Sequence, residues 1–154
     1  MKGPLFSQLE DNDPVWVVYN KNYENRDALY ELTLAKGKVV RNYLDNREMN
    51  VADRYEEPEY VSVQEQYMEI QVEGYSAHYR RHYSDLYDKK GQMLMHPDYN
   101  DHGPEVNVFV TKELAKEYLT CWCEHTINSC NERIKKLQEE IAVNQNCINA
   151  VKDI

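Results

Sequence analysis

The sequence INSCNERIKKLQEEIAVNQNCINAV, residues 127–151, carries the clearest periodic pattern in the chain. Its apolar positions recur in alternating steps of three and four residues, with one asparagine in the series. We call these eight residues the helix seam: Ile127, Cys130, Ile134, Leu137, Ile141, Asn144, Ile148 and Val151. The spacing predicts an α-helix whose apolar side packs against another element.

Two ways of covering the helix seam remain open from the sequence. The seam can pair with a second copy of the chain, as in a homodimer, or it can pack against the rest of its own chain. The charged and amide residues beside the seam give little preference for a particular partner; they are Arg133, Gln138, Glu140 and Gln145. Asn144 can fix the register of a helix pair at some cost in stability.

The residues before the seam predict where the helical segment begins. Thr111 is a suitable N-cap, because its hydroxyl can accept a hydrogen bond from an exposed main-chain amide. A first apolar stripe follows, out of phase with the helix seam: Ala115, Tyr118 and Trp122. Ser129 and Glu132 then have the spacing of a capping box. Residues 111–154 are therefore predicted to form either one long helix or two helices with a break near Asn128.

Residues 1–110 are predicted to form a β-rich body, because their apolar and β-branched residues occur in short runs separated by turn residues. The expected strands are Val15–Tyr19, buried on both faces, a hairpin over Leu29–Leu44 that turns at Lys36-Gly37, Tyr60–Val63, Tyr67–Val72 and Val106–Val110. Asp45–Pro58 and His96–Pro104 are expected to be loops. The predicted fold class is α+β: a small antiparallel sheet of about five strands, or an open SH3-like barrel, followed by the C-terminal helical segment, in a single domain overall.

The segment Tyr75–Tyr87 fits two patterns. As a strand it places Tyr75, Tyr79 and Tyr83 on one face, and as a helix it places the same residues four apart on one stripe. The abundance of tyrosine slightly favours a strand. A tight turn with a glycine at positive φ is expected at the following Asp88–Gly91.

The charge of the chain narrows the class of partner. The formal net charge is −9, from 27 acidic and 18 basic residues, which argues against direct binding to nucleic acid. Seven acids lie between Asp53 and Glu73. They form either a solvated surface or a mimic of nucleic-acid phosphates directed at a basic groove. The candidate partner-binding residues are Asp53, Glu56, Glu57, Glu59 and Glu65, together with Tyr60 and Tyr67.

Tyrosine is unusually frequent, with 13 residues against two phenylalanines and two tryptophans. Its ring and hydroxyl suit half-buried sheet surfaces and hydrated interfaces. No apolar run has the length of a signal peptide or a membrane span, so we expect a cytoplasmic protein with reduced cysteines.

One group of side chains suggests chemistry. His78, Arg80 and His82 would share one face of a strand, where two imidazoles and a guanidinium could bind an anion such as phosphate. No nucleophile or carboxylate pair accompanies them, so a small phosphate-binding enzyme is the last of three hypotheses and no catalytic residue is assigned. Cys121, Cys123 and Cys130 lack the spacing of a zinc site and are expected to be buried thiols. No metal and no cofactor is predicted.

The turn at Asp88–Gly91 and the run VFVTKELAKEYL, residues 108–119, carry a resemblance. Over residues 67–120 the chain resembles small, mostly uncharacterised bacteriophage accessory proteins, in which a short open β-barrel or curled sheet precedes a helix that starts in this way. The resemblance implies a phage-encoded protein in a bacterial host cytoplasm that binds and redirects or inhibits another protein. It provides no catalytic residues.

These observations lead to one main functional expectation and one chief alternative. The main expectation is a non-enzymatic protein that occupies or inhibits a partner, such as a host nucleic-acid-handling or defence protein, through its acidic, tyrosine-rich surface. The alternative is a homo-oligomeric assembly protein that pairs through the helix seam.

Overall fold

The computed structural model describes residues 3–154. Its elements in chain order are the 3₁₀ turn η1 (Phe6–Gln8), β1 (Pro14–Asn20), β2 (Leu32–Asn50), β3 (Tyr60–Val72), β4 (Tyr79–Tyr83), α1 (Asp85–Lys90), β5 (Gln92–Met95), β6 (Val106–Phe109) and α2 (Lys112–Lys152). The chain divides into two compact units, the first ending at Leu119 and the second comprising Thr120–Ile154.

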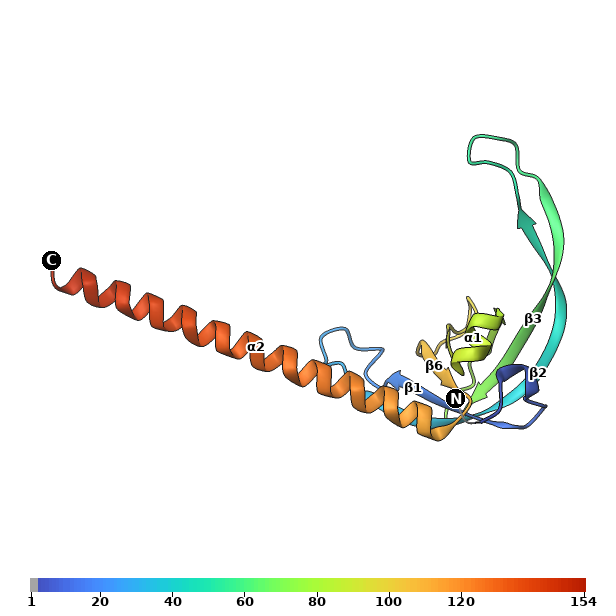
Figure 1. Cartoon of the computed structure of the whole chain (residues 1–154), viewed down its shortest axis with the longest axis horizontal. Coiled ribbons are helices and arrows are strands. Elements are labelled where there is room, and N and C mark those ends of the chain that lie inside the picture. Colours follow the sequence, from blue (N-terminus) through green and yellow to red (C-terminus); the bar gives the residue numbers. More distant parts are fainter. Residues whose placement is uncertain (1–2) are drawn as a thin grey trace. The chain divides into compact units, whose positions relative to one another are not determined.

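The strands form one antiparallel sheet of six strands in the order β4-β3-β2-β1-β6-β5. A single antiparallel bridge between Tyr79, in β4, and Pro97, just after β5, joins the two ends of this sheet. The sheet is therefore a nearly closed barrel (Figure 1). The predicted α+β class with a small barrel and a C-terminal helix is confirmed, with six strands rather than about five.

Strand β1 lies at the centre of the body and is buried on both faces, as predicted. Val15 and Val17 face the barrel interior, which also holds Phe6 from η1, Ile70 and other apolar side chains. On the opposite face, Val18 belongs to a second cluster that includes Ala115 from the first turns of α2. The beginning of α2 thus covers the outer side of the sheet next to β1.

The predicted hairpin turn at Lys36-Gly37 is wrong, because both residues lie inside the 19-residue strand β2. Gly37 is required there by close packing rather than by a turn. A Cβ atom at this position would lie 2.9 Å from the main-chain oxygen of Gln71 and 3.1 Å from a methyl group of Val15. The same glycine that suggests a turn in the sequence lets neighbouring strands approach closely in the barrel.

The expected long loop over Asp45–Pro58 is wrong in its first part, because β2 continues to Asn50. Tyr60–Val63 and Tyr67–Val72 are likewise parts of the single strand β3. Residues 45–50 and 60–65 pair only with each other, since β1 and β4 pair with earlier parts of β2 and later parts of β3. We call these two segments and the connecting loop, residues 51–59, the arm, which extends beyond the barrel (Figure 1).

The segment Tyr75–Tyr87 contains a strand, as favoured by its tyrosines, and then the start of α1. Strand β4 covers Tyr79–Tyr83, and the expected tight turn at Asp88–Gly91 is the end of α1. Gly91 has φ of 67°, and its amide donates hydrogen bonds to the carbonyl oxygens of Tyr87 and Asp88. The predicted glycine at positive φ is confirmed, and it forms the C-cap of α1.

Helix α2 begins as predicted, because the main-chain N–H of Leu114 donates to Oγ1 of Thr111 at 3.2 Å. It continues without interruption for 41 residues to Lys152, so the alternative of a break near Asn128 is wrong. At 1.5 Å per residue the helix is about 60 Å long. None of the helices within residues 3–154 combines the length and apolar character needed to cross a membrane.

Candidate functional site

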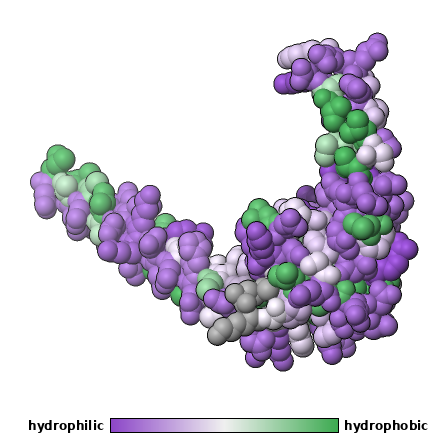
Figure 2. Space-filling view, turned by 45° about the vertical axis from the view of Figure 1, so that its right-hand side comes forward, coloured by the Kyte–Doolittle hydropathy of each residue, from purple (hydrophilic) through white to green (hydrophobic). Residues whose placement is uncertain are grey.

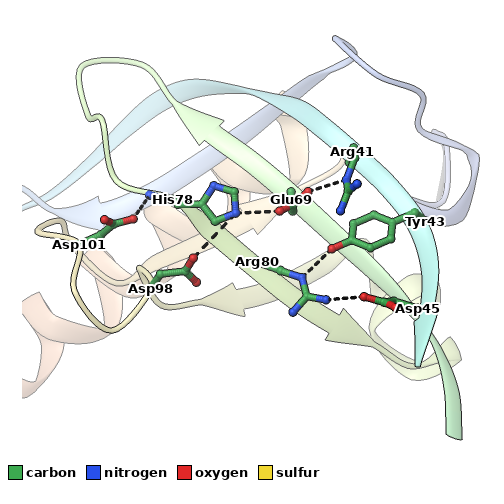
Figure 3. A network of polar contacts seen from close by, with 8 residues as sticks. All are labelled: Arg41, Tyr43, Asp45, Glu69, His78, Arg80, Asp98 and Asp101. Atoms are coloured by element: carbon green, nitrogen blue, oxygen red, sulfur yellow. Dashed lines mark hydrogen bonds and ion pairs between the residues drawn. The ribbon is translucent and has the colours of Figure 1, made fainter. Parts of the chain in front are cut away.

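A network of charged side chains and tyrosines covers the outer face of β2, β3 and β4 (Figure 3). At its centre, the carboxylate of Glu69 is only 11% exposed. Nε of Arg41 donates to one carboxylate oxygen at 2.8 Å, and Nε2 of His78 lies 2.7 Å from the other. Such pairing satisfies a carboxylate that would otherwise be costly to remove from water.

Arg80 forms the second part of this network. Its Nε donates to the hydroxyl of Tyr43 at 2.6 Å, and its Nη2 donates to a carboxylate oxygen of Asp45 at 3.0 Å. The guanidinium also lies 4.0 Å from the ring centroid of Tyr67, which stacks on Tyr43. The hydrogen bond with Tyr43 is the main cause of the raised pKa of Arg80. The guanidinium is therefore held by three neighbours at once.

Glu65 joins the base of the arm to this network. Nη2 of Arg47 donates to its Oε1 at 2.7 Å, and Nε2 of His82 lies 3.7 Å from its Oε2. The hydrogen bond from Arg47 holds the pKa of Glu65 below its ordinary value, against the opposing effect of burial. Oε2 of Glu65 and Nε of Arg47 are buried without a hydrogen-bond partner. This ion pair links β2 and β3 where the arm leaves the barrel.

The structure places the three residues of the predicted anion site on one face, but each is close to a carboxylate. His78 contacts Glu69, Arg80 contacts Asp45, and His82 lies near the paired Glu65. Arg80 and His82 also line an open pocket of about 500 Å³ with Tyr67 and residues 96–99. Because the carboxylates neutralise much of the positive charge, this face offers a weak field for phosphate. Within residues 3–154 no group of His, Cys, Asp and Glu side chains has the arrangement of a metal site.

The candidate partner-binding residues fall into two groups. Tyr60 lies at the start of β3, directly after the exposed loop at the arm tip, residues 51–59. This loop contains four of the candidate acids: Asp53, Glu56, Glu57 and Glu59. Glu65 and Tyr67 instead lie in the network described above. The loop is closed by Asn50, whose Oδ1 accepts hydrogen bonds from the amides of Ala52 and Glu59. The structure thus gathers the acids of the loop and separates them from the other two candidates.

The arm tip also exposes aromatic and aliphatic groups. Tyr55 is 92% exposed and Tyr60 63%, and Val51 and Val61 are partly exposed beside them. Figure 2 shows the hydrophilic end of the arm next to hydrophobic surface lower on the same arm. Tyr55 was not among the sequence-based candidates; its position among the acids of the predicted loop was the available signal.

The helix seam is exposed along the second unit of the chain. Its six large apolar side chains are between 52% and 67% exposed: Ile127, Ile134, Leu137, Ile141, Ile148 and Val151. Cys130 is partly buried, and the side-chain amide of Asn144 donates to the carbonyl oxygen of Glu140 at 2.8 Å. Figure 2 shows hydrophobic surface on this helix, most extensively near its C-terminal end. Such a continuous apolar face on one helix is typical of a contact surface.

The cysteines do not follow the expectation of buried thiols. Cys121 and Cys123 are exposed, and so is Cys147 further along the helix. The expectation of buried thiols is therefore wrong for Cys121 and Cys123.

Replacing Glu65 with glutamine tests the ion pair at the base of the arm. The carboxylate has a lowered pKa in the folded chain, so it stabilises the fold above its unfolded pKa, and this stabilisation is lost as the pH falls through the folded pKa. We expect the free energy of unfolding to fall more steeply between about pH 5 and pH 3 in the wild type than in Glu65→Gln, as measured by urea unfolding.

Glu59→Gln, at the exposed arm tip, is the control and should retain the wild-type pH dependence. Equal pH dependence in the wild type and Glu65→Gln would contradict a stabilising role of this pair.

The chain has no match among protein-family models, curated proteins or solved structures.

Proposed function

We propose that this chain is a non-enzymatic assembly protein that acts by association, with the helix seam as its main contact surface. The observation that carries this proposal is the row of six large apolar side chains, each more than half exposed, on one side of the continuous helix α2. Pairing with another helix would bury this row, and full burial of one such side chain is worth about 1.5–3 kcal/mol.

The composition of the helix supports the need for a partner. Residues 120–152 contain only two alanines, Ala142 and Ala150, but five asparagines and four isoleucines. Asparagine and β-branched residues are weak helix formers, and in proteins most helical stability comes from packing of an amphipathic face. A helix of this composition and length therefore gains much of its stability from packing of its apolar face.

The side of the helix away from the seam is suited to water. Glu132 precedes Lys136 by four residues, and Lys135 precedes Glu139 by the same interval. Opposite charges at this spacing stabilise a helix surface modestly. The polar side can thus remain solvated while the seam is covered, which is the division expected of a helix in a coiled coil.

Ile141→Asp tests the seam, with Val143→Asp as the matched control. Both residues are exposed to a similar extent on α2, at 58% and 60%, but Val143 lies outside the seam. An aspartate buried in the seam should cost about 3 kcal/mol or more and weaken association more than a hundredfold. We expect sedimentation equilibrium to give a multiple of the 18.3 kDa chain mass for the wild type and Val143→Asp, and the single-chain mass for Ile141→Asp.

A wild-type chain that remains monomeric at every concentration would contradict self-association. Equal loss of association in both variants would show that the seam is not the contact surface.

The arm tip is a second candidate contact surface, because it combines four exposed acids with the exposed rings of Tyr55 and Tyr60. Acidic groups speed the approach to a basic surface, and tyrosine is common among the residues that dominate binding energy. The fitting partner is a protein with a basic groove, such as a nucleic-acid-handling or host-defence protein. If the arm tip binds such a protein, the chain would inhibit it by occupying its basic groove.

Charge reversal at the arm tip tests the second surface. The variant carries Glu56→Lys, Glu57→Lys and Glu59→Lys, and the control carries the same number of reversals at exposed acids elsewhere: Asp11, Asp27 and Asp153. We expect proteins retained from a bacterial lysate by the immobilised wild type to be retained by the control and lost from the arm variant. Retention of the same proteins by both variants would contradict a role of the arm acids.

A further inference from the structure

We infer that the helix seam takes a second copy of this chain in parallel orientation and in register, so that each Asn144 faces its counterpart. This inference rests on the proposed function and adds the identity and orientation of the partner. It follows from three features of α2: the residue types at alternate seam positions, the single asparagine among them, and the groups beside the seam.

Alternate positions of the seam hold different residue types. In the seven-residue repeat, the four isoleucines occupy every a position: Ile127, Ile134, Ile141 and Ile148. The d positions hold Cys130, Leu137, Asn144 and Val151. β-Branched residues at a favour parallel pairs of helices when leucine occupies d, as Leu137 does at one of the four d positions.

Asn144 distinguishes the two orientations. In a parallel pair in register, residues with the same number face each other, and the two asparagine side chains meet. Each amide has two N–H donors and one acceptor oxygen, so the pair can share a hydrogen bond while one donor keeps its contact with the carbonyl oxygen of Glu140. In an antiparallel pair whose seams overlap along their whole length, Ile127 of one copy faces Val151 of the other. Asn144 then faces Ile134, whose side chain offers no hydrogen bond. The side-chain oxygen of Asn144 would then be buried without a hydrogen-bond donor, which is destabilising, so the asparagine favours the parallel pair.

The residues beside the seam agree with this orientation. In the parallel pair, Arg133 lies next to Gln138 of the second copy, and Glu140 lies next to Gln145. No like charges meet at these flanking positions. In the antiparallel pair of full overlap, Glu140 lies close to its own counterpart, and two carboxylates repel each other.

The parallel orientation has a consequence for function. Each barrel precedes its helix in the chain, so a parallel pair joins two barrels at the same end of the coiled coil. Two arm tips are then presented by one assembly, which raises the effective concentration of the second tip once the first is bound.

The native cysteines provide the test in the full-length chain. One variant keeps only Cys130, with the other three cysteines replaced by serine, and the control keeps only Cys121, which points away from the seam at a b position. Oxidised glutathione is the oxidant: the Cys130 thiolate first forms a mixed disulfide with glutathione, and the thiolate of the second copy then displaces reduced glutathione. The mass of each variant is measured first without oxidant, to establish that the paired state is retained.

In the parallel pair the two Cys130 thiols face each other, so we expect this variant to form a covalent dimer at least ten times faster than the Cys121 variant.

In the antiparallel pair the two Cys130 positions are about 27 Å apart along the helices, too far for a disulfide. Cys130 would then lie near Cys147 of the other copy. A variant that keeps only these two cysteines would form a disulfide between Cys130 of one copy and Cys147 of the other in the antiparallel pair. A noncovalent dimer that links Cys130 to Cys147 but not Cys130 to Cys130 overturns the parallel orientation and leaves the proposed function intact. A single-chain mass before oxidation overturns both.

Discussion

The structure of this chain depends on how the apolar face of α2 is removed from water. The first turns of the helix meet this requirement within the body, where Ala115 and Leu114 pack against the outer side of the sheet. The helix then continues to Lys152 with a second apolar face that remains exposed in the single chain. An exposed apolar row of this length on one side of a helix is typical of a face that packs against another element. We therefore propose that association stabilises the C-terminal segment.

The barrel limits the surfaces that remain available for function. Its outer charged face is internally paired, because Glu69 holds Arg41 and His78 while Arg80 is held by Tyr43 and Asp45. These contacts give the sheet a stable exterior and neutralise the groups that could have bound an anion. The arm tip and the helix seam differ from this face, because their charged or apolar groups are directed to solvent. Both surfaces are therefore available for contact with a partner.

Local sequence signals predicted the elements whose formation depends on neighbouring residues. Thr111 as N-cap, the buried strand around Val17 and the periodicity of the helix seam were all recognisable, and so was the α+β class. The errors arose where distant segments decide the structure. Gly37 suggested a turn, although its lack of a Cβ serves the approach of Gln71 from another strand. The carboxylate partners of His78 and Arg80 came from β3 and β2, and only the strand register brings them together.

Amide hydrogen exchange of residues 127–151 at several chain concentrations tests the central claim most directly. If the helix is stable because two copies pair, protection of these amides rises with concentration and falls on dilution, while protection of the barrel strands stays constant. Strong protection that is the same at every concentration would show that the helix is stable without a second copy, and would contradict the account.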